Sequence, residues 1–521
     1  MTFLRNYAKL KEIPHERSRT ITMRTAAIFS SHMVLQQGRP ICIWGEGQDG
    51  EHISVTLGNV GADTVAANGK WKLYLPPQTA ANGLTMTIVG KDERLVFTDI
   101  SIGEVWLCGG QSNMEFEICN EKNGEALLSA LTPDCGVRFY YTPKLHMIDA
   151  NFDAAERSTC WQTASPTAAR AWSAVGLYCA LELQKKLGVT VGLIGCNWGG
   201  TSATSWIPRE TIAEHPQLSP YLDDYDRAME GVTLEEHIRA FDAYAAYQGA
   251  WHLKSTAYKK AHPDASWEDI EAACGKSQYP GPMGPKSERR PGGLYETMLS
   301  RVCPYTLRGF LFYQGESDAC YPDTYGILLR ALIAKWRKDW ENPDLPFLFV
   351  QLPMFRYASE PDSGSWAVIR EHQMQTAQTV ANTALAIIPD CGEWNEIHPS
   401  DKSQVGHRLA LLALAEVYGL LPQTQAHPPV YQSYEIIGDT MILHFANGAL
   451  APCNDPCGFE LAGADGIFYP ACAKNSADTV TLQAEQVPCP TAARYAWADY
   501  CAISLYGENG LPVSPFRTAK A

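Results

Sequence analysis

The sequence lacks long apolar runs and clusters of basic residues. No stretch approaches the roughly 18 consecutive uncharged apolar residues that span a bilayer, so we expect no membrane partner. Lys and Arg number 42 against 57 Asp and Glu, which gives a formal net charge of -15. Because phosphate binding needs clustered Lys and Arg, and no such run is present, we also expect no nucleic-acid partner.

Paired cysteines and a secretory leader are absent as well. The 16 cysteines form no Cys-x-x-Cys pair, a distribution typical of reduced, packed thiols and not of a disulfide framework or a zinc site. Residues 1–25 carry Lys and Arg without the apolar block of a signal peptide. The sequence therefore predicts a cytoplasmic protein, or a periplasmic or secreted one if a leader was removed.

Length and composition indicate an ordered protein of several domains. A chain of 521 residues exceeds the roughly 250 to 300 residues that one core serves, and 45% of its residues are hydrophobic. The predicted division is an N-terminal extension at 1–25, a β-sandwich module at 26–102, an α/β domain at 103–424 with an insertion at about 208–291, and a C-terminal β module at 425–521.

The spacing of hydrophobic residues along the chain supports this division. Short alternating runs broken by Gly, Asn and Asp fill residues 28–102 and predict an antiparallel sandwich, and period two returns after about residue 428. Between them, apolar strands alternate with helical periods, which predicts a parallel sheet covered by helices. The expected strands are 105–107, 191–195, 309–313, 346–352 and 384–388, and the expected helices are 174–187, 324–340, 365–381 and 400–418.

Unusual residues follow several of these strands. In an open α/β sheet the ligand crevice lies at the carboxyl ends of the strands. The first strand runs into Gly-Gly-Gln-Ser-Asn-Met, where two glycines permit a sharp turn that exposes Ser112. The second leads to glycines, including Gly200, whose N–H groups suit an oxyanion, and the third delivers Gln314 and Glu316 side by side. Each segment alone is equally typical of an ordinary turn or helix cap.

A histidine follows the last predicted strand. His398 has Glu396 and Glu393 two and five residues upstream, and Ser400 is placed to cap the next helix. A serine hydroxyl needs a base to take its proton, and the base needs a third group to orient it, so Ser112 and His398 form a candidate pair. No Gly-x-Ser-x-Gly elbow surrounds Ser112 and no His-Glu-x-x-His occurs, which disfavours those two hydrolase classes.

Together these segments resemble the sialate O-acetylesterases, a carbohydrate esterase family within the SGNH hydrolase class. The matching blocks, in the family's order, are GEVWLCGGQSNME at 103–115, WGGT at 198–201, YQGES at 313–317 and IHP at 397–399. Flanking segments at 32–37 and 494–499 also look like family segments, so the resemblance spans about residues 28–518 outside much of the insertion.

The resemblance implies a three-layer α/β/α catalytic domain of SGNH type with flanking β modules, acting without a metal or another cofactor. Ser112 would be the nucleophile and His398 the general base. The N–H groups of Ser112 and Gly200 and the side chain of Gln314 would form the oxyanion hole. The expected substrate is an O-acetyl ester of a sialic acid. Acetylxylan or another acetylated glycan is the alternative, and a non-catalytic carbohydrate-binding protein is a further one.

The sequence does not decide which acid would orient the imidazole of His398. The wider class has Asp three residues before the His, where this chain has Asn395. The resemblance makes Glu396 the first choice, because members of that family often carry an acid at this position. Neighbouring side chains tend to face opposite ways, so Asn395 and Glu396 are not both expected to reach the imidazole. Asp390, Glu393 or a backbone carbonyl are alternatives. The remaining residues considered for substrate binding or as the acid are Trp198, Glu316, Asn395 and Asp390. The oligomeric state and the role of the insertion stay open.

Overall fold

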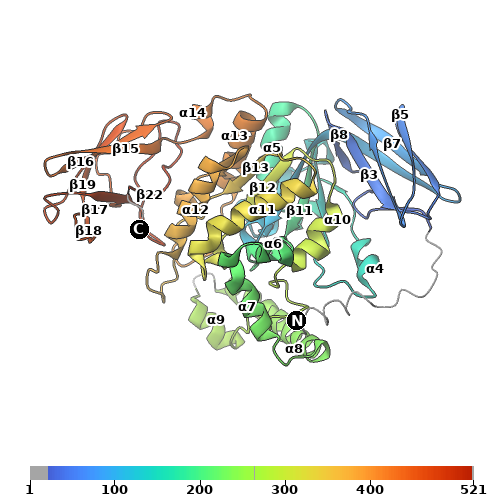
Figure 1. Cartoon of the computed structure of the whole chain (residues 1–521), viewed down its shortest axis with the longest axis horizontal. Helices are drawn as coiled ribbons and strands as arrows, with labels where there is room; N and C mark the ends of the chain where they lie inside the picture. Colours follow the sequence, from blue (N-terminus) through green and yellow to red (C-terminus); the bar gives the residue numbers. More distant parts are fainter. Residues whose placement is uncertain (1–21, 263–264, 519–521) are drawn as a thin grey trace.

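The computed structural model describes residues 22–262 and 265–518. A central α/β region lies between an N-terminal β region and a C-terminal β region at opposite ends of the long axis (Figure 1). No helix in these two described ranges is long and apolar enough to cross a membrane. Residues 1–21, most of the predicted N-terminal extension, lie outside the described residues.

The centre of the molecule is a mostly parallel sheet, so the predicted α/β fold is confirmed. Its strands run in the order β10-β9-β11-β8-β12-β13-β14, with only the short edge strand β10 antiparallel to its neighbour. Strands β11, β12 and β13 are buried along their whole length, as expected where helices cover both faces of a parallel sheet. Their bounds are Arg94–Gly110 (β8), Val137–Tyr141 (β9), Gln162–Thr163 (β10), Val191–Asn197 (β11), Gly309–Tyr313 (β12), Phe347–Val350 (β13) and Thr383–Ala386 (β14).

Two pairs of helices cover this sheet: α5 (Ala174–Leu187) packs on α13 (Ser403–Leu412), and α11 (Tyr325–Asp339) packs on α12 (Ser365–Thr379). From β8 the chain first reaches β9 and returns to β11 on one side, and it then continues through β12, β13 and β14 on the other. Strand order therefore reverses at β8, and a ligand crevice is expected beyond its carboxyl end. The short helices are Ser112–Glu115 (α2), Gly124–Ala130 (α3), Phe152–Glu156 (α4), Ser300–Val302 (α10) and Gln423–Ala426 (α14).

The N-terminal β region shares a strand with the central sheet. The 17-residue strand β8 pairs with β7 and β2 in its first part and with β11 and β12 in its second, so it runs through the predicted domain boundary at residue 102. Strands β4, β5 and β7 extend this sheet, and β1-β3-β6 form a separate one. The bounds are Arg24–Thr25 (β1), Val34–Gln36 (β2), Ile41–Glu46 (β3), His52–Leu57 (β4), Val60–Val65 (β5), Lys70–Leu75 (β6) and Ala81–Val89 (β7).

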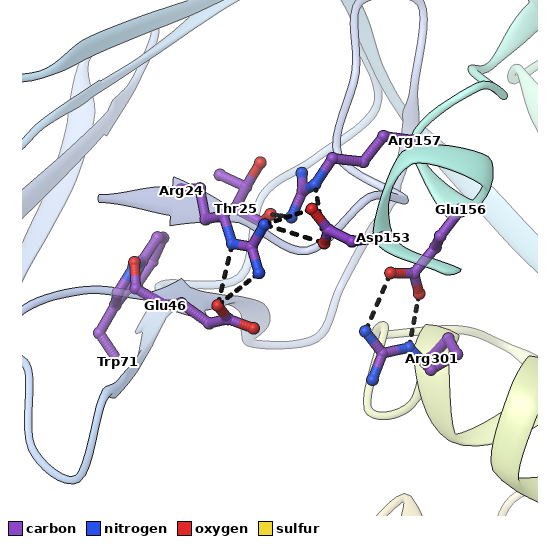
Figure 2. A network of polar contacts seen from close by, with 8 residues as sticks. All are labelled: Arg24, Thr25, Glu46, Trp71, Asp153, Glu156, Arg157 and Arg301. Atoms are coloured by element: carbon purple, nitrogen blue, oxygen red, sulfur yellow. Dashed lines mark hydrogen bonds and ion pairs between the residues drawn. The ribbon is translucent and has the colours of Figure 1, made fainter. Parts of the chain in front are cut away.

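Ion pairs tie this β region to the central one (Figure 2). Arg24 on β1 pairs with Glu46 on β3 at 2.7 Å and with Asp153 on α4 at 2.7 Å. On the same helix, Glu156 accepts two hydrogen bonds from Arg301 of α10, at 2.5 and 2.9 Å. Arg24 is partly exposed, so its pairs contribute at most about 1 kcal/mol each and mainly fix the docking of α4.

The C-terminal β region consists of two four-stranded sheets, in the orders β15-β16-β20-β19 and β18-β17-β21-β22. Alternate residues of β16 and β20, such as Met441, Leu443 and Val480, fill the core between them. The bounds are Val430–Ile437 (β15), Thr440–Ala446 (β16), Phe459–Ala462 (β17), Phe468–Pro470 (β18), Cys472–Asn475 (β19), Thr479–Gln483 (β20), Ala492–Tyr495 (β21) and Phe516–Arg517 (β22).

The insertion is largely helical and gathers at one side of the central region, at the bottom of Figure 1. Its longest helix, α8, begins at a capping box in which Thr233 and Glu236 bond each other's backbone N–H groups. The helices are Arg209–Ala213 (α6), Ser219–Ala228 (α7), Leu234–Ala261 (α8) and Trp267–Cys274 (α9).

Candidate active site

Ser112 lies immediately beyond the carboxyl end of β8. Gly110 has a φ of 131°, and a Cβ atom there would lie 2.1 Å from the carbonyl oxygen of Tyr313, so only glycine fits. The chain then turns, and Ser112 becomes the first residue of the one-turn helix α2. Local backbone geometry thus places the hydroxyl at the point where the strand order reverses.

His398 reaches Ser112 from the loop after β14. Its Nε2 atom lies 2.8 Å from the Ser112 Oγ atom, although 286 residues separate the two in sequence. Partial burial lowers the pKa of His398 below the ordinary imidazole value. The ring is therefore neutral near pH 7 and able to accept the hydroxyl proton.

Glu396 lies beside the imidazole. Its Oε1 atom accepts a hydrogen bond from the backbone N–H of His398 at 3.0 Å and lies 4.0 Å from the Nδ1 atom of the ring. Its other carboxylate oxygen pairs with Lys259 of α8 at 3.2 Å. The carboxylate thus stabilises an imidazolium by charge, at a distance longer than a direct hydrogen bond to Nδ1.

Asp390 and Asn395 are engaged elsewhere. Both carboxylate oxygens of Asp390 bind Arg408, at 2.5 and 2.6 Å. The Oδ1 atom of Asn395 accepts a hydrogen bond from the backbone of Ala358 at 2.8 Å. Both side chains stabilise the loop structure around the histidine.

Glu393 and Ser400 shape the loop that carries His398. The backbone N–H of Ser400 donates to Glu393 at 3.1 Å. The prediction that Ser400 caps the following helix is wrong, because α13 begins at Ser403 and Lys402 occupies its N-cap position. Ser400 is bonded to Glu393 within the loop, and the helix begins three residues later.

Two backbone N–H groups near the Ser112 hydroxyl are free. In the part of the chain that the structure describes, neither Ser112 nor Gly200 donates its N–H to an acceptor. The two segments lie close together, since a Cβ atom on Gly199 would lie 3.2 Å from the Cβ of Ser112. Gly200 itself has a φ of 71°, which favours glycine. Such free donors suit a developing negative charge.

Gln314 is buried and its amide group is already bonded. The Nε2 atom lies 2.5 Å from a carboxylate oxygen of Asp318, 3.1 Å from the side-chain oxygen of Gln111 and 3.2 Å from the carbonyl oxygen of Thr201. The amide therefore joins the loops after β8, β11 and β12 instead of presenting a free N–H beside Ser112.

Asn113 connects the nucleophile turn with the histidine loop, a role that sequence reasoning missed. Its side-chain nitrogen donates to Glu316 at 2.6 Å and to the carbonyl oxygen of Ile397 at 3.0 Å, and its oxygen accepts from Lys402 at 2.6 Å. Burial raises the pKa of Glu316 and lowers that of Lys402 to about 8. Glu316 thus lies beneath the site as a buried support. The position of Asn113 next to Ser112 in the sequence was the one observation that could have indicated this role.

Side chains from the insertion line the site. The ring of Trp198 lies 4.8 Å from that of His146, which lies 5.1 Å from Phe241 on α8. The hydroxyl of Tyr279 lies against Gly200, where an added Cβ atom would come within 2.1 Å of it. The insertion therefore forms part of the wall around Ser112. The sequence left two roles open for the insertion, a wall of the pocket or a subunit contact, and these contacts favour the first.

In the described ranges, His, Cys, Asp and Glu side chains nowhere form a group of three or more that suits a metal ion.

Comparisons with known proteins find carbohydrate esterases. Residues 284–415 match the family described as carbohydrate esterase, sialic acid-specific acetylesterase. The chain is 26% identical to the sialate O-acetylesterase of Mus musculus over 96% of its own length and 95% of the relative's, and 25% identical to that of Homo sapiens over 96% and 93%. Its structure is similar to a carbohydrate acetylesterase from Xanthomonas citri, with a TM-score of 0.75, 28% identity and coverage of 96% of this chain and all of that one.

The fold, the paired serine and histidine, and these matches define an ester hydrolase of the carbohydrate esterase class. Within that class, the chain is similar over nearly its whole length to sialate O-acetylesterases.

Proposed function

We propose that this protein removes O-acetyl groups from sialic acids, with Ser112 as nucleophile and His398 as general base. The 2.8 Å contact between their reacting atoms, at the strand-order reversal of the sheet, carries the proposal. The names of the relatives support the sugar. The order β11-β8-β12-β13-β14 supports an SGNH-type catalytic domain at 103–424 between β modules at 26–102 and 425–521.

The proposed reaction has two halves. The Ser112 oxygen attacks the acetyl carbonyl carbon while His398 Nε2 takes the hydroxyl proton, and the oxyanion binds the N–H groups of Ser112 and Gly200. As the intermediate collapses, His398 gives that proton to the departing sugar oxygen, and an acetyl-serine remains. Water then attacks, His398 takes its proton, and the same proton returns to Ser112 as acetate leaves.

Glu396 and Gln314 have supporting parts in this proposal. Glu396 stabilises the imidazolium, and its contact with Nδ1 tightens when substrate binds, since catalytic hydrogen bonds are often long in free enzymes. Gln314 positions the loop that carries Gly200 through Thr201. To donate to the oxyanion itself, as the resemblance implies, its amide would have to leave Asp318.

Acetate release from a panel of O-acetylated carbohydrates tests the substrate class. We expect release from 9-O-acetyl-N-acetylneuraminate and little from acetylxylan, because the proposal assigns the site to a single acidic sugar. Preference for acetylxylan or another neutral glycan would replace the proposed substrate and leave the serine chemistry intact.

Replacing Glu396 tests the orienting acid. We expect Glu396→Gln to lower kcat about 10- to 100-fold, less than the roughly 10⁴-fold loss known for a triad acid bonded directly to its histidine. Because Glu396 raises the pKa of His398, the variant should also move the acid limb of kcat/KM to lower pH. Both effects are read from pH–rate profiles with p-nitrophenyl acetate.

Glu393→Gln is the matched control, since it makes the same chemical change in the same loop, where Glu393 bonds a backbone N–H away from the imidazole. We expect near wild-type activity. If Glu393→Gln lost more activity than Glu396→Gln, Glu396 would not be the acid.

A further inference from the structure

A hollow lies among the loops at the carboxyl edge of the sheet. It is a cleft of about 330 Å³ built mainly by the segment between β13 and α12, a volume within the range of small-molecule sites. We call it the 355–366 cleft. Its lining residues are Ala319, Phe355, Arg356, Tyr357, Glu360, Pro361, Ser363, Ser365, Trp366 and Asp499.

The cleft adjoins the histidine loop. The backbone N–H of Asn395 donates to the carbonyl oxygen of Arg356 at 3.2 Å, and Ala358 donates to the Asn395 side chain at 2.8 Å. These bonds join the cleft wall to the segment just before Glu396. Burial and the negative charge of Glu396 both raise the pKa of Tyr357, which agrees with a position between the cleft and the catalytic groups.

Arg356 is the cation of this cleft and has no carboxylate partner in the described part of the chain. Its guanidinium lies 5.0 Å from the ring centre of Trp394, and its buried Nε atom has no hydrogen-bond partner. The terminal nitrogens of the guanidinium also donate to no acceptor in the described part of the chain. Leaving a charged group unpaired in this way is costly unless a ligand completes it. The stacking on Trp394 keeps the planar group oriented for an anion.

The cleft contains two carboxylates, and one is already satisfied. Asp499 accepts hydrogen bonds from the backbone of Gly364 and Trp366 and from both the backbone and hydroxyl of Ser363, at 2.8 to 3.1 Å. Glu360 is exposed, and its carboxylate has no hydrogen-bond or ion-pair partner in the described part of the chain. Glu360 is thus the group that competes with an incoming anion.

We propose that the 355–366 cleft binds the carboxylate-bearing part of the acidic sugar, with Arg356 pairing with the carboxylate while the acetyl ester lies at Ser112. This inference rests on the proposed function and adds the residue that selects an acidic sugar. Among the aromatic side chains of the lining, Phe355 and Trp366 are buried and Tyr357 is exposed, so Tyr357 offers surface to the sugar body. A neutral acetylated sugar would leave Arg356 unpaired.

The test compares 9-O-acetyl-N-acetylneuraminate with its methyl ester, which lacks the negative charge. We expect Arg356→Gln to raise KM for the acid at least about tenfold and to leave KM for the methyl ester unchanged, because only the acid loses a charge-assisted bond. Arg356→Lys should recover part of the loss, and Glu360→Gln should lower KM for the acid. Arg94→Gln, at an exposed position on β8, is the control and should change neither.

Equal losses on the acid and the methyl ester would show that Arg356 only supports the loop, and no loss on either would remove it from substrate binding. Wild-type protein gives an independent measurement if the variants fold poorly. N-acetylneuraminate should inhibit p-nitrophenyl acetate hydrolysis about tenfold more strongly than its methyl ester, and equal inhibition would overturn the proposal. Failure of the proposed function would appear differently, as no acetate release from either acetylated sialate.

Discussion

Ser112→Ala is expected to abolish p-nitrophenyl acetate hydrolysis, with a loss of at least about 10⁴-fold in kcat. The variant removes the atom that the proposed mechanism acetylates, while the N–H groups of Ser112 and Gly200 remain without an acceptor in the described part of the chain. Those donors and the binding surfaces support only a residual rate, as in other serine hydrolases that lose their nucleophile. Initial rates at saturating substrate, with purified protein, measure the loss.

The fold should survive this change, so lost activity will report chemistry. Ser112 is partly exposed. In the described part of the chain, its hydroxyl has a hydrogen bond with His398 and with no other side chain. We expect the midpoint of thermal unfolding to stay within a few degrees of wild type. Ser129→Ala, an exposed position on α3, is the matched control and should keep full activity. Retention of more than a tenth of the wild-type rate by Ser112→Ala would exclude it as nucleophile.

The sequence predicted the central sheet well because its signal is local. Strands such as Gly309–Tyr313 are continuous apolar runs, and helix Ala174–Leu187 has a serine cap and a glycine end, so each element is encoded within its own residues. Strand β9 was missed because Val137–Tyr141 has a charged residue inside a short run. The boundary at residue 102 falls inside β8, since a change of period does not interrupt a strand that serves two sheets.

The contact between Ser112 and His398 was predictable for a different reason. Parallel strands bring their carboxyl ends to one edge, so residues far apart in sequence, such as Ser112 and His398, meet there. The acid that orients the imidazole could not be predicted. Asn395 and Glu396 are neighbours, and only the conformation of the loop determines which side chain faces His398. Lys259 and Tyr279 come from the insertion, whose packing onto the site depends on long-range contacts that no short pattern encodes.

His398→Ala is expected to lower kcat about as far as Ser112→Ala. Without a base the hydroxyl keeps its proton and is a poor nucleophile. The wild-type enzyme should show kcat/KM that is flat near pH 7 and falls about tenfold per pH unit below the His398 pKa, because only the neutral ring accepts a proton. Since burial lowers that pKa, the fall should begin below pH 6.5, and the variant should lack it. Rates between pH 4 and 8 measure both effects.

The double variant decides whether the two residues act as one unit. If Ser112 and His398 share a single proton transfer across their 2.8 Å contact, removing the second costs almost nothing once the first is gone. We therefore expect Ser112→Ala/His398→Ala to be no slower than either single variant. Additive losses would mean that each residue stabilises the transition state separately, and the proposed proton transfer would then be wrong even if both single variants were inactive.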